Sequence, residues 1–290
     1  MRLKTILLII LSTTLLIASA ADTQAFQIYT HKGKKVDFAK VVKATQSKQY
    51  IFFGEYHDNP IAHWLEFELT RELHAMYTNH FMLGAEMFEA DNQFIIDEYL
   101  NDLIASKNFQ DEVRLWPNYN TDYKPIMEYA KKHEINFIAT NIPRRYASMV
   151  YKNGVTSLTS LTELAKSYIA PLDKFVFDST VTCYKELIIS MGDHGGVNLA
   201  QAQAIKDATM AHFILKATAA DPKAVMLHLN GAYHSDNYQG IVYYLQNTVD
   251  KEKIMTISCV EQKDINQLES SNEGIADFIV CIPSSMTKTH

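Results

Sequence analysis

The stretch QYIFFGEYHD, residues 49–58, places a short apolar run directly before a glutamate, a histidine and an aspartate. Three later stretches follow the same plan: FMLGA at 81–85, NFIA at 136–139 and AVMLHL at 224–229, each followed by polar residues. Short apolar runs separated by helix-length segments are typical of parallel strands that are buried on both faces. The sequence therefore predicts an α/β fold, with a mostly parallel sheet flanked by helices.

Four of the residues behind these runs carry acid–base side chains: Glu55, His57, Glu86 and His234. In open parallel sheets, ligands bind outside the carboxyl ends of the strands. We therefore expect all four residues to lie around one cavity. A carboxylate beside an imidazole suits a divalent metal or the activation of water. The structural alternative is that each side chain caps a helix or bonds to nearby backbone.

Two arginines and a glycine-flanked histidine are further candidates for ligand binding. Arg144 and Arg145 follow the third run, and one of two consecutive arginines usually faces outward. The other can bind a carboxylate or a phosphate with two parallel hydrogen bonds, and an ion pair with Glu86 or Asp122 is the alternative. His194 precedes two glycines, which expose backbone and let a ligand approach.

Five other histidines are expected to have no direct role at a site. His228 lies inside the fourth run and is interpreted as a hydrogen-bonded core histidine. The other four fall on expected helices or their ends and are expected at the surface: His63, His74, His80 and His133.

The segment 145–219 contains no strand pattern and is expected to be a helical insertion. About seventy residues between two strands exceed what a single crossover helix needs. We expect this insertion to lie over the carboxyl edge of the sheet as a lid, with helices at 145–151, 160–165, 173–190 and 199–217. Elsewhere, the sequence predicts helices at 37–45, 60–80, 92–103 and 124–133, and two more strands at 253–260 and 276–282.

The first twenty residues are expected to be a signal peptide. Arg2 and Lys4 precede an apolar segment at 6–17, and Ala18-Ser19-Ala20 fits the small-residue rule for cleavage. An uncleaved anchor is the alternative. No cysteine follows the apolar segment, so the exported chain would carry no lipid on an N-terminal cysteine. We expect residues 21–290 to form one α/β domain without a transmembrane segment, because no second run of eighteen apolar residues exists.

Composition and missing motifs exclude several classes of protein. Hydrophobic residues make up 47% of the chain and charged residues 21%, which describes a globular protein and not a disordered one. A formal charge of -6 provides no basic footprint for nucleic acid. Motifs of dinucleotide enzymes, P-loop NTPases, serine hydrolases and c-type cytochromes are absent. Cys259 and Cys281 fall in the last two expected strands, where neighbouring strands could bring them within bridging distance.

Six segments of the sequence resemble one known family. They are GEYHDNPIAHWLEFEL at 54–69, GAEMFEADNQFIIDEYL at 84–100, WPNYNTDYKPIMEYA at 116–130, NIPRRYASMV at 141–150, GDHGGVNLAQAQAIKDATMA at 192–211, and NGAYH at 230–234. In these segments the chain resembles the ChaN-like haem-binding uptake proteins, a bacterial iron-regulated family related to the erythromycin esterase and Tiki group. The combination of GExHD, the tryptophan segment, the AQAxxDATMA run and the final histidine is fairly specific.

The resemblance implies an α/β sheet with a helical insertion, and haem binding in the periplasm or at the cell surface during iron uptake. It also implies a pocket completed by a homodimer, in which a tyrosine of one subunit ligates iron and basic side chains of the other hold the propionates. The candidates for haem contact here are Tyr146, Tyr151, Arg144, Arg145 and His194. The sequence departs from the family in its missing lipid-bearing cysteine, in Gly195 where many relatives have cysteine, and in NGAYH where GNGH is frequent.

Two functions follow from these observations. The first is a haem carrier, and we favour a binding protein over an enzyme on the strength of the resemblance. The alternative is a metal- or Glu/His-dependent hydrolase of the erythromycin esterase/Tiki type. In that alternative Glu55, His57, Glu86 and His234 supply the acid–base groups or bind the metal.

Overall fold

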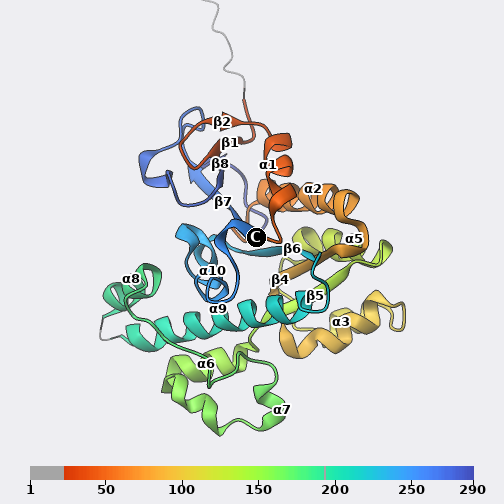
Figure 1. The fold of residues 1–290 in the computed structure, drawn as a ribbon, viewed down its shortest axis with the longest axis vertical. Helices are drawn as coiled ribbons and strands as arrows, with labels where there is room; N and C mark the ends of the chain where they lie inside the picture. Colours follow the sequence, from red (N-terminus) through yellow and green to blue (C-terminus); the bar gives the residue numbers. More distant parts are fainter. Residues whose placement is uncertain (1–22, 193) are drawn as a thin grey trace, which may run out of the picture.

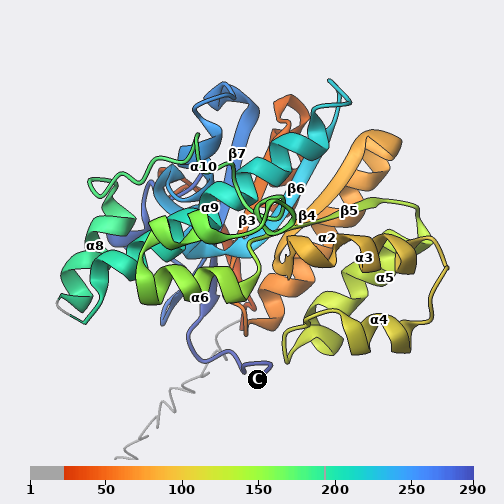
Figure 2. The ribbon, with the colours of Figure 1, turned by 90° about the horizontal axis from the view of Figure 1, so that it is seen from below.

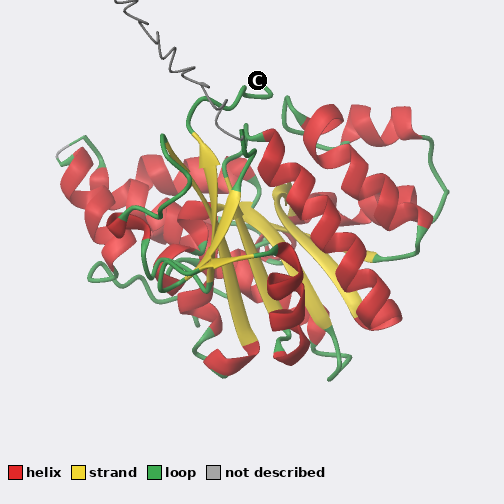
Figure 3. Ribbon diagram, turned by 90° about the horizontal axis from the view of Figure 1, so that it is seen from above, coloured by secondary structure: helices red, strands yellow, loops and turns green. Residues whose placement is uncertain are grey.

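Six parallel strands form the centre of the computed structural model, which describes residues 23–192 and 194–290. They are β3 (Tyr50–Glu55), β4 (Phe81–Glu89), β5 (Asn136–Asn141), β6 (Val225–Gly231), β7 (Ile254–Gln262) and β8 (Phe278–Pro283). The sheet has the order β2-β1-β8-β7-β3-β6-β4-β5 and lies between two layers of helices (Figure 3). The α/β fold predicted from the sequence is confirmed.

Two short strands at one edge of the sheet are not predicted by the sequence. β1 (Gln27–Thr30) pairs with β8, and β2 (Lys35–Val36) pairs with β1, both in the antiparallel direction. Strands of four and two residues are too short for an alternating pattern to stand out.

The central strands bury both of their faces. All six residues of β3 and all seven of β6 are buried, so their sequences are continuous apolar runs without alternation. Along β3, Ile51 and Phe53 pack into the core on one side of the sheet, whereas Phe52 packs into the core on the other side. Both sides of the sheet therefore need a covering layer of helices.

The first layer consists of α1 (Phe38–Ala44), α2 (Pro60–Tyr77), α3 (Gln93–Leu100), α4 (Ser106–Glu112) and α5 (Lys124–Lys132), which share one apolar core with the sheet. Asn59 caps the amino end of α2, since its side chain accepts hydrogen bonds from the backbone N–H groups of Ile61 and Ala62. The second layer contains α9 (Gly196–Thr218) and α10 (Ile241–Leu245) (Figure 1). The sequence does not predict α4 and α10, because seven and five residues are too few to establish a helical period.

The segment between β5 and β6 is helical, but only part of it lies beyond the carboxyl edge of the sheet. It contains α6 (Arg144–Asn153), α7 (Glu163–Lys166), α8 (Thr182–Met191) and α9, and α6 runs beside α9 (Figure 2). In the second half of α9, Met210 and Ile214 pack on the face of the sheet, and Thr218 reaches Tyr50 at the amino end of β3. The expected lid is corrected accordingly: half of its longest helix is a covering layer, because the exposed apolar face of the sheet would otherwise lack one.

The helix expected at 173–190 is wrong in its first half, since α8 begins at Thr182. The Asp178 carboxylate accepts hydrogen bonds from the backbone N–H and the hydroxyl of Thr180, at 2.8 and 2.6 Å. A local side-chain bond of this kind competes with helical backbone bonding.

Cys259 and Cys281 lie on neighbouring strands but are not bridged. β7 and β8 pair in a register that places Cys259 opposite Val280 and Cys281 opposite Val260. The two cysteines are therefore one position out of step and point to opposite faces of the sheet.

The expected signal peptide, residues 1–20, lies outside the described residues. Among the helices within 23–192 and 194–290, none is long and apolar enough to cross a membrane.

His228 is a buried core histidine, as the sequence predicts. Its ring nitrogens lie 2.8 Å from the Thr140 hydroxyl and 3.0 Å from Asn230 Oδ1. Burial lowers the pKa of His228 from 6.5 to about 4, and the bond to Asn230 offsets this only in part.

We expect His228 to make the fold sensitive to acid. His228 is protonated below about pH 6.5 in the unfolded chain, but only below about pH 4 in the folded protein. The free energy of unfolding should therefore fall by about 3 kcal/mol as the pH is lowered from 6.5 to 4. Urea unfolding of the wild type and of His228→Gln, at neutral pH and at about pH 4, measures the effect. The wild type should lose stability more steeply than the variant, and parallel curves would contradict the assignment.

Candidate functional site

A cavity of about 870 Å³ opens at the carboxyl edge of the sheet. Glu55 ends β3, His57 follows it, Glu86 lies in β4, and His234 ends the short 3-10 helix η6 (Ala232–His234) after β6. All four line this cavity, so the structure brings together the residues that the sequence predicts there. The catalytic and metal-binding roles assigned to them remain predictions.

His57 is held by a buried carboxylate and stays partly open to the cavity. Its Nδ1 lies 2.6 Å from Glu55 Oε1, which also accepts a hydrogen bond of 2.7 Å from the Tyr123 hydroxyl. The Trp116 ring packs against the imidazole, with 4.7 Å between the centroids. Burial alone would lower the pKa of His57, but the hydrogen bond to Glu55 and the charge of Glu86 raise it. The result is an oriented imidazole with an exposed side toward the cavity.

A second charged group links the sheet to helix α9. His234 Nδ1 lies 2.5 Å from Asp207 Oδ1, and its Nε2 lies 3.2 Å from Glu86 Oε1. Burial alone would lower the pKa of His234, but these two carboxylates raise it to about 10. Burial likewise works to raise the pKa of Glu86, and the charge of His234 lowers it to about 2. His234 is therefore an imidazolium between two carboxylates.

The position of Glu86 depends on an irregularity in β4. The strand continues beyond Glu86 to Glu89, and its register with β5 shifts between Ala85 and Glu89. A register shift of this kind changes the direction in which a side chain such as that of Glu86 points. The Glu86 carboxylate accepts a hydrogen bond of 2.8 Å from the backbone N–H of Gly231, at the end of the neighbouring strand.

Asp207 is a site residue that the sequence reasoning misses. It is fully buried on α9 and accepts a 2.7 Å hydrogen bond from the Tyr184 hydroxyl. A signal is present, because Asp207 interrupts the run of small and apolar residues AQAQAIKDATMA at 200–211. A carboxylate in a buried helix face costs free energy unless it is paired.

His63 is also misplaced by the sequence reasoning, which expects it at the surface. It is 6% exposed, and its Nδ1 lies 3.1 Å from Glu55 Oε2 and 3.2 Å from Glu66 Oε2. Burial alone would lower the pKa of His63, but Glu55 and Glu66 raise it to about 11. Burial and the charge of Glu55 raise the pKa of Glu66. The spacing of α2 contains the signal, since Glu66 falls in its inward stripe with Leu65 and Leu69.

The remaining walls of the cavity combine cationic and aromatic side chains: Arg114, Arg144, Lys206, Tyr56, Trp116 and Tyr233. Arg145 turns away and forms an ion pair of 2.5 Å with Asp91. The two consecutive arginines thus point to different places. Within the described part of the chain, neither forms the alternative ion pair with Glu86 or Asp122.

Besides Arg145, three residues expected at a haem site lie outside this cavity. Tyr146 packs in the core between α6 and α9, under the guanidinium of Arg145 at 4.4 Å. Tyr151, at the other end of α6, is 43% exposed. His194 is exposed in the turn before α9, and the adjacent Gly195 lies next to the Tyr151 ring. Of the residues of the predicted haem site, Arg144 lines the cavity, Arg145 and Tyr146 lie beside it at the start of α6, and Tyr151 lies near the end of that helix.

We expect Gly231→Ala to disturb His57. A Cβ at position 231 would lie 2.7 Å from His57 Nε2, so the imidazole must move and its bond to Glu55 must lengthen or break. Overpacking of this kind costs about 1–3 kcal/mol. The imidazole resonances of His57 report the displacement. Gly84→Ala is the matched control, because its Cβ would crowd His228 and should leave the His57 resonances in place.

Comparison with models of known protein families identifies the family of this chain. A family model described as haem-binding uptake, Tiki superfamily, ChaN, matches residues 41–245, which is well over half of the chain. Among curated proteins, none matches.

Two solved structures are similar in fold. One describes cofacial haem binding to ChaN of Campylobacter jejuni; it is 18% identical with a TM-score of 0.65, over 88% of this chain and 96% of that one. The other is a mutant of the erythromycin esterase EreC in its open conformation; it is 10% identical with a TM-score of 0.52, over 91% and 98% of the two chains. At such identities the likeness extends to the fold alone, whereas the family match covers the strand-edge motifs themselves. The chain therefore belongs to the ChaN family of haem-binding uptake proteins, within the Tiki superfamily.

Proposed function

We propose that this protein is an exported haem-binding protein that serves haem or iron uptake. Family membership supports haem as the ligand, as does the described haem binding of ChaN from Campylobacter jejuni. The sequence of residues 1–20 supports export. The observation that carries the proposal is the phenol of Tyr151, exposed at the outer end of the helical insertion.

Tyr151 is better suited than Tyr146 to ligate iron. The Tyr146 hydroxyl accepts a hydrogen bond of 3.2 Å from Arg145, and its ring lies under the same guanidinium. Both contacts would have to break before Tyr146 could reach a haem. In the described part of the chain no group hydrogen-bonds to the Tyr151 hydroxyl. A phenolate on iron favours the ferric state, which suits a carrier that must hold haem without activating oxygen.

The surroundings of Tyr151 suit one face of a porphyrin. Val197 is 49% exposed at the start of α9, where Gly195 approaches the Tyr151 ring and His194 is exposed. A single open face buries only one side of a haem, so a second copy of the chain would cover the other. In such a homodimer, basic side chains of one subunit hold the propionates of the haem on the other, and Arg144 is exposed and without an ion pair among the described residues.

Of the two histidines of the cavity, His234 is the less suited to bind iron. Both of its ring nitrogens face carboxylates, whereas His57 is held by Glu55 through Nδ1 alone. An imidazole needs a free lone pair to ligate iron, and His234 as an imidazolium has none.

We expect Tyr151→Phe to weaken haemin binding by about tenfold or more, because the variant keeps the ring and loses the ligand oxygen. Titration with haemin, followed by the Soret band, measures this loss. The wild type should saturate at one haem per chain. Tyr146→Phe is the matched control, with the same substitution on the same helix, and should bind as the wild type does.

Light scattering during the same titration tests the homodimer, which should form as haemin saturates the protein. Normal haemin binding by Tyr151→Phe, combined with loss of binding in His57→Ala, would move the iron to the cavity and overturn this assignment.

A hydrolase is the second candidate, and the Glu55–His57 contact of 2.6 Å favours it. A carboxylate-oriented imidazole facing a cavity can act as a general base. The nearby cations, Arg114, Arg144 and Lys206, would suit an anionic or polarised substrate.

If this second function holds, His57→Ala should lower the hydrolysis of ester substrates by about a hundredfold or more. A panel of chromogenic esters with the haem-free protein provides the measurement. Tyr151→Phe serves as the control because it lies outside the cavity. No hydrolysis by the wild type would leave the haem carrier as the only candidate.

A further inference from the structure

We propose that Glu55, His63 and Glu66 bind a divalent first-row transition cation, in a site behind the floor of the cavity. One ligand atom from each of these residues lies within 4.8 Å of the other two. His63 and Glu66 come from the inward face of α2, and Glu55 comes from the end of β3. None of the three is more than 6% exposed.

The two nitrogens of His63 face different kinds of partner. Nε2 lies 3.2 Å from the backbone carbonyl oxygen of His57 and 3.4 Å from the Asp122 carboxylate, so it carries a hydrogen and donates it. Nδ1 faces only the carboxylate oxygens of Glu55 and Glu66. A metal-binding histidine typically has this arrangement, with one nitrogen donating to a carbonyl or carboxylate and the other free for the metal.

Two oxygen atoms of the cluster have no hydrogen-bond partner among the described residues. They are Glu66 Oε1 and Glu55 Oε2, both on buried side chains, and Glu55 Oε2 has only the 3.1 Å contact with His63 Nδ1. A buried, unpaired carboxylate oxygen is expensive, because it has lost water and gained nothing in its place. A cation held by Glu55 Oε2, His63 Nδ1 and both carboxylate oxygens of Glu66 would satisfy these atoms.

The separations of the ligand atoms match a small cation. His63 Nδ1 lies 3.1 Å from Glu55 Oε2 and 3.2 Å from Glu66 Oε2. Metal–ligand bonds of about 2.0–2.2 Å set roughly a hundred degrees apart would place ligand atoms at such distances. One imidazole and two carboxylates favour Zn²⁺, Mn²⁺ or Fe²⁺ over Ca²⁺, which takes six to eight oxygens. Two carboxylates and a neutral imidazole also balance the charge of a divalent cation.

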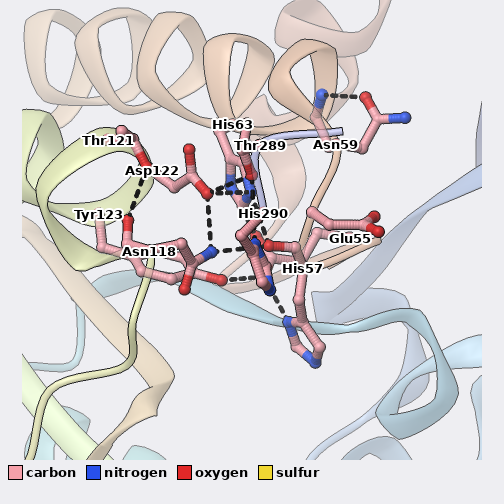
Figure 4. Close-up of polar contacts among 12 residues, drawn as sticks. Glu55, His57, Asn59, His63, Asn118, Thr121, Asp122, Tyr123, Thr289 and His290 are labelled. Carbon is pink, nitrogen blue, oxygen red and sulfur yellow. Dashed lines mark hydrogen bonds and ion pairs between the residues drawn. The ribbon is translucent and has the colours of Figure 1, made fainter. Parts of the chain in front are cut away.

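The cation would hold the floor of the cavity in place. Glu55 would use Oε2 for the metal, while its Oε1 keeps His57 and Tyr123. Asn118 connects the loop of His57 to Asp122, because its side-chain amide donates hydrogen bonds to both the His57 carbonyl oxygen and the Asp122 carboxylate (Figure 4). The metal would therefore fix the orientation of His57 without contacting a ligand in the cavity.

The competing arrangement places protons where the cation would lie, on His63 and between the two carboxylates. Isothermal titration of haem-free, chelator-treated protein with ZnCl₂, and separately with MnCl₂, distinguishes the two. We expect one tight site per chain.

Glu66→Gln should weaken binding at least about tenfold, because the amide cannot supply the charge of the carboxylate. Glu72→Gln is the matched control on the exposed side of α2, and Glu86→Gln should also retain the cation.

Three results would overturn the proposal. Wild-type protein that binds neither Zn²⁺ nor Mn²⁺ tightly would show that protons occupy the cluster. Equal binding by Glu66→Gln would place the cation elsewhere, and loss of binding in Glu86→Gln would place it in the cavity. Should Glu66→Gln fail to fold, X-ray absorption of the zinc-loaded wild type decides: one imidazole in the coordination shell is expected, and two would indicate His57 and His234 instead.

Discussion

Glu55 ends a central strand as a buried carboxylate, and the segments around the cavity are arranged to satisfy it. Its Oε1 is shared by His57 and Tyr123, and its Oε2 faces His63. These partners come from the strand-end loop, from the irregular turn before α5 and from α2, so one carboxylate connects three separate parts of the first helical layer to the sheet. An unpaired charge at this depth would cost several kcal/mol, which makes the partners obligatory for the fold as well as for any chemistry.

The buried His234 connects helices to the sheet in the same way as Glu55, on the other side of the sheet. His234 lies between Glu86 of β4 and Asp207 of α9, and Tyr184 of α8 bonds to the same aspartate. The long insertion is therefore attached to the sheet edge by charge as well as by apolar packing. Because α9 both covers a sheet face and contributes Lys206 to the cavity wall, a change in that helix would alter stability and the site together.

The two proposed functions use different regions of one molecule. The charged cavity has imidazoles held in place by carboxylates, and in His234 both ring nitrogens are engaged in this way. The outer end of the insertion has the exposed phenol of Tyr151 next to Gly195, and Val197, two residues further along the chain, is also exposed. A flat ligand such as haem needs an accessible ligand atom and apolar surface, whereas acid–base chemistry needs oriented groups in a sheltered place. The fold thus provides both environments, about one helix length apart along α6.

Local pattern in the sequence was sufficient for the six parallel strands, for the burial of both faces of the sheet and for the gathering of Glu55, His57, Glu86 and His234. Those features follow from apolar periodicity and from the rule that parallel strands present their carboxyl ends to one edge. Tertiary structure alone decided that His63 is buried, that Asp207 reaches His234, and that Arg144, and not Arg145, lines the cavity. The same holds for the one-residue offset that keeps Cys259 from Cys281. The physical reason is that apolar periodicity shows which face of a helix or strand is buried. The position of a buried charged side chain depends also on its partner. That partner lies on another element, and only the packed fold sets the register and rotation of that element.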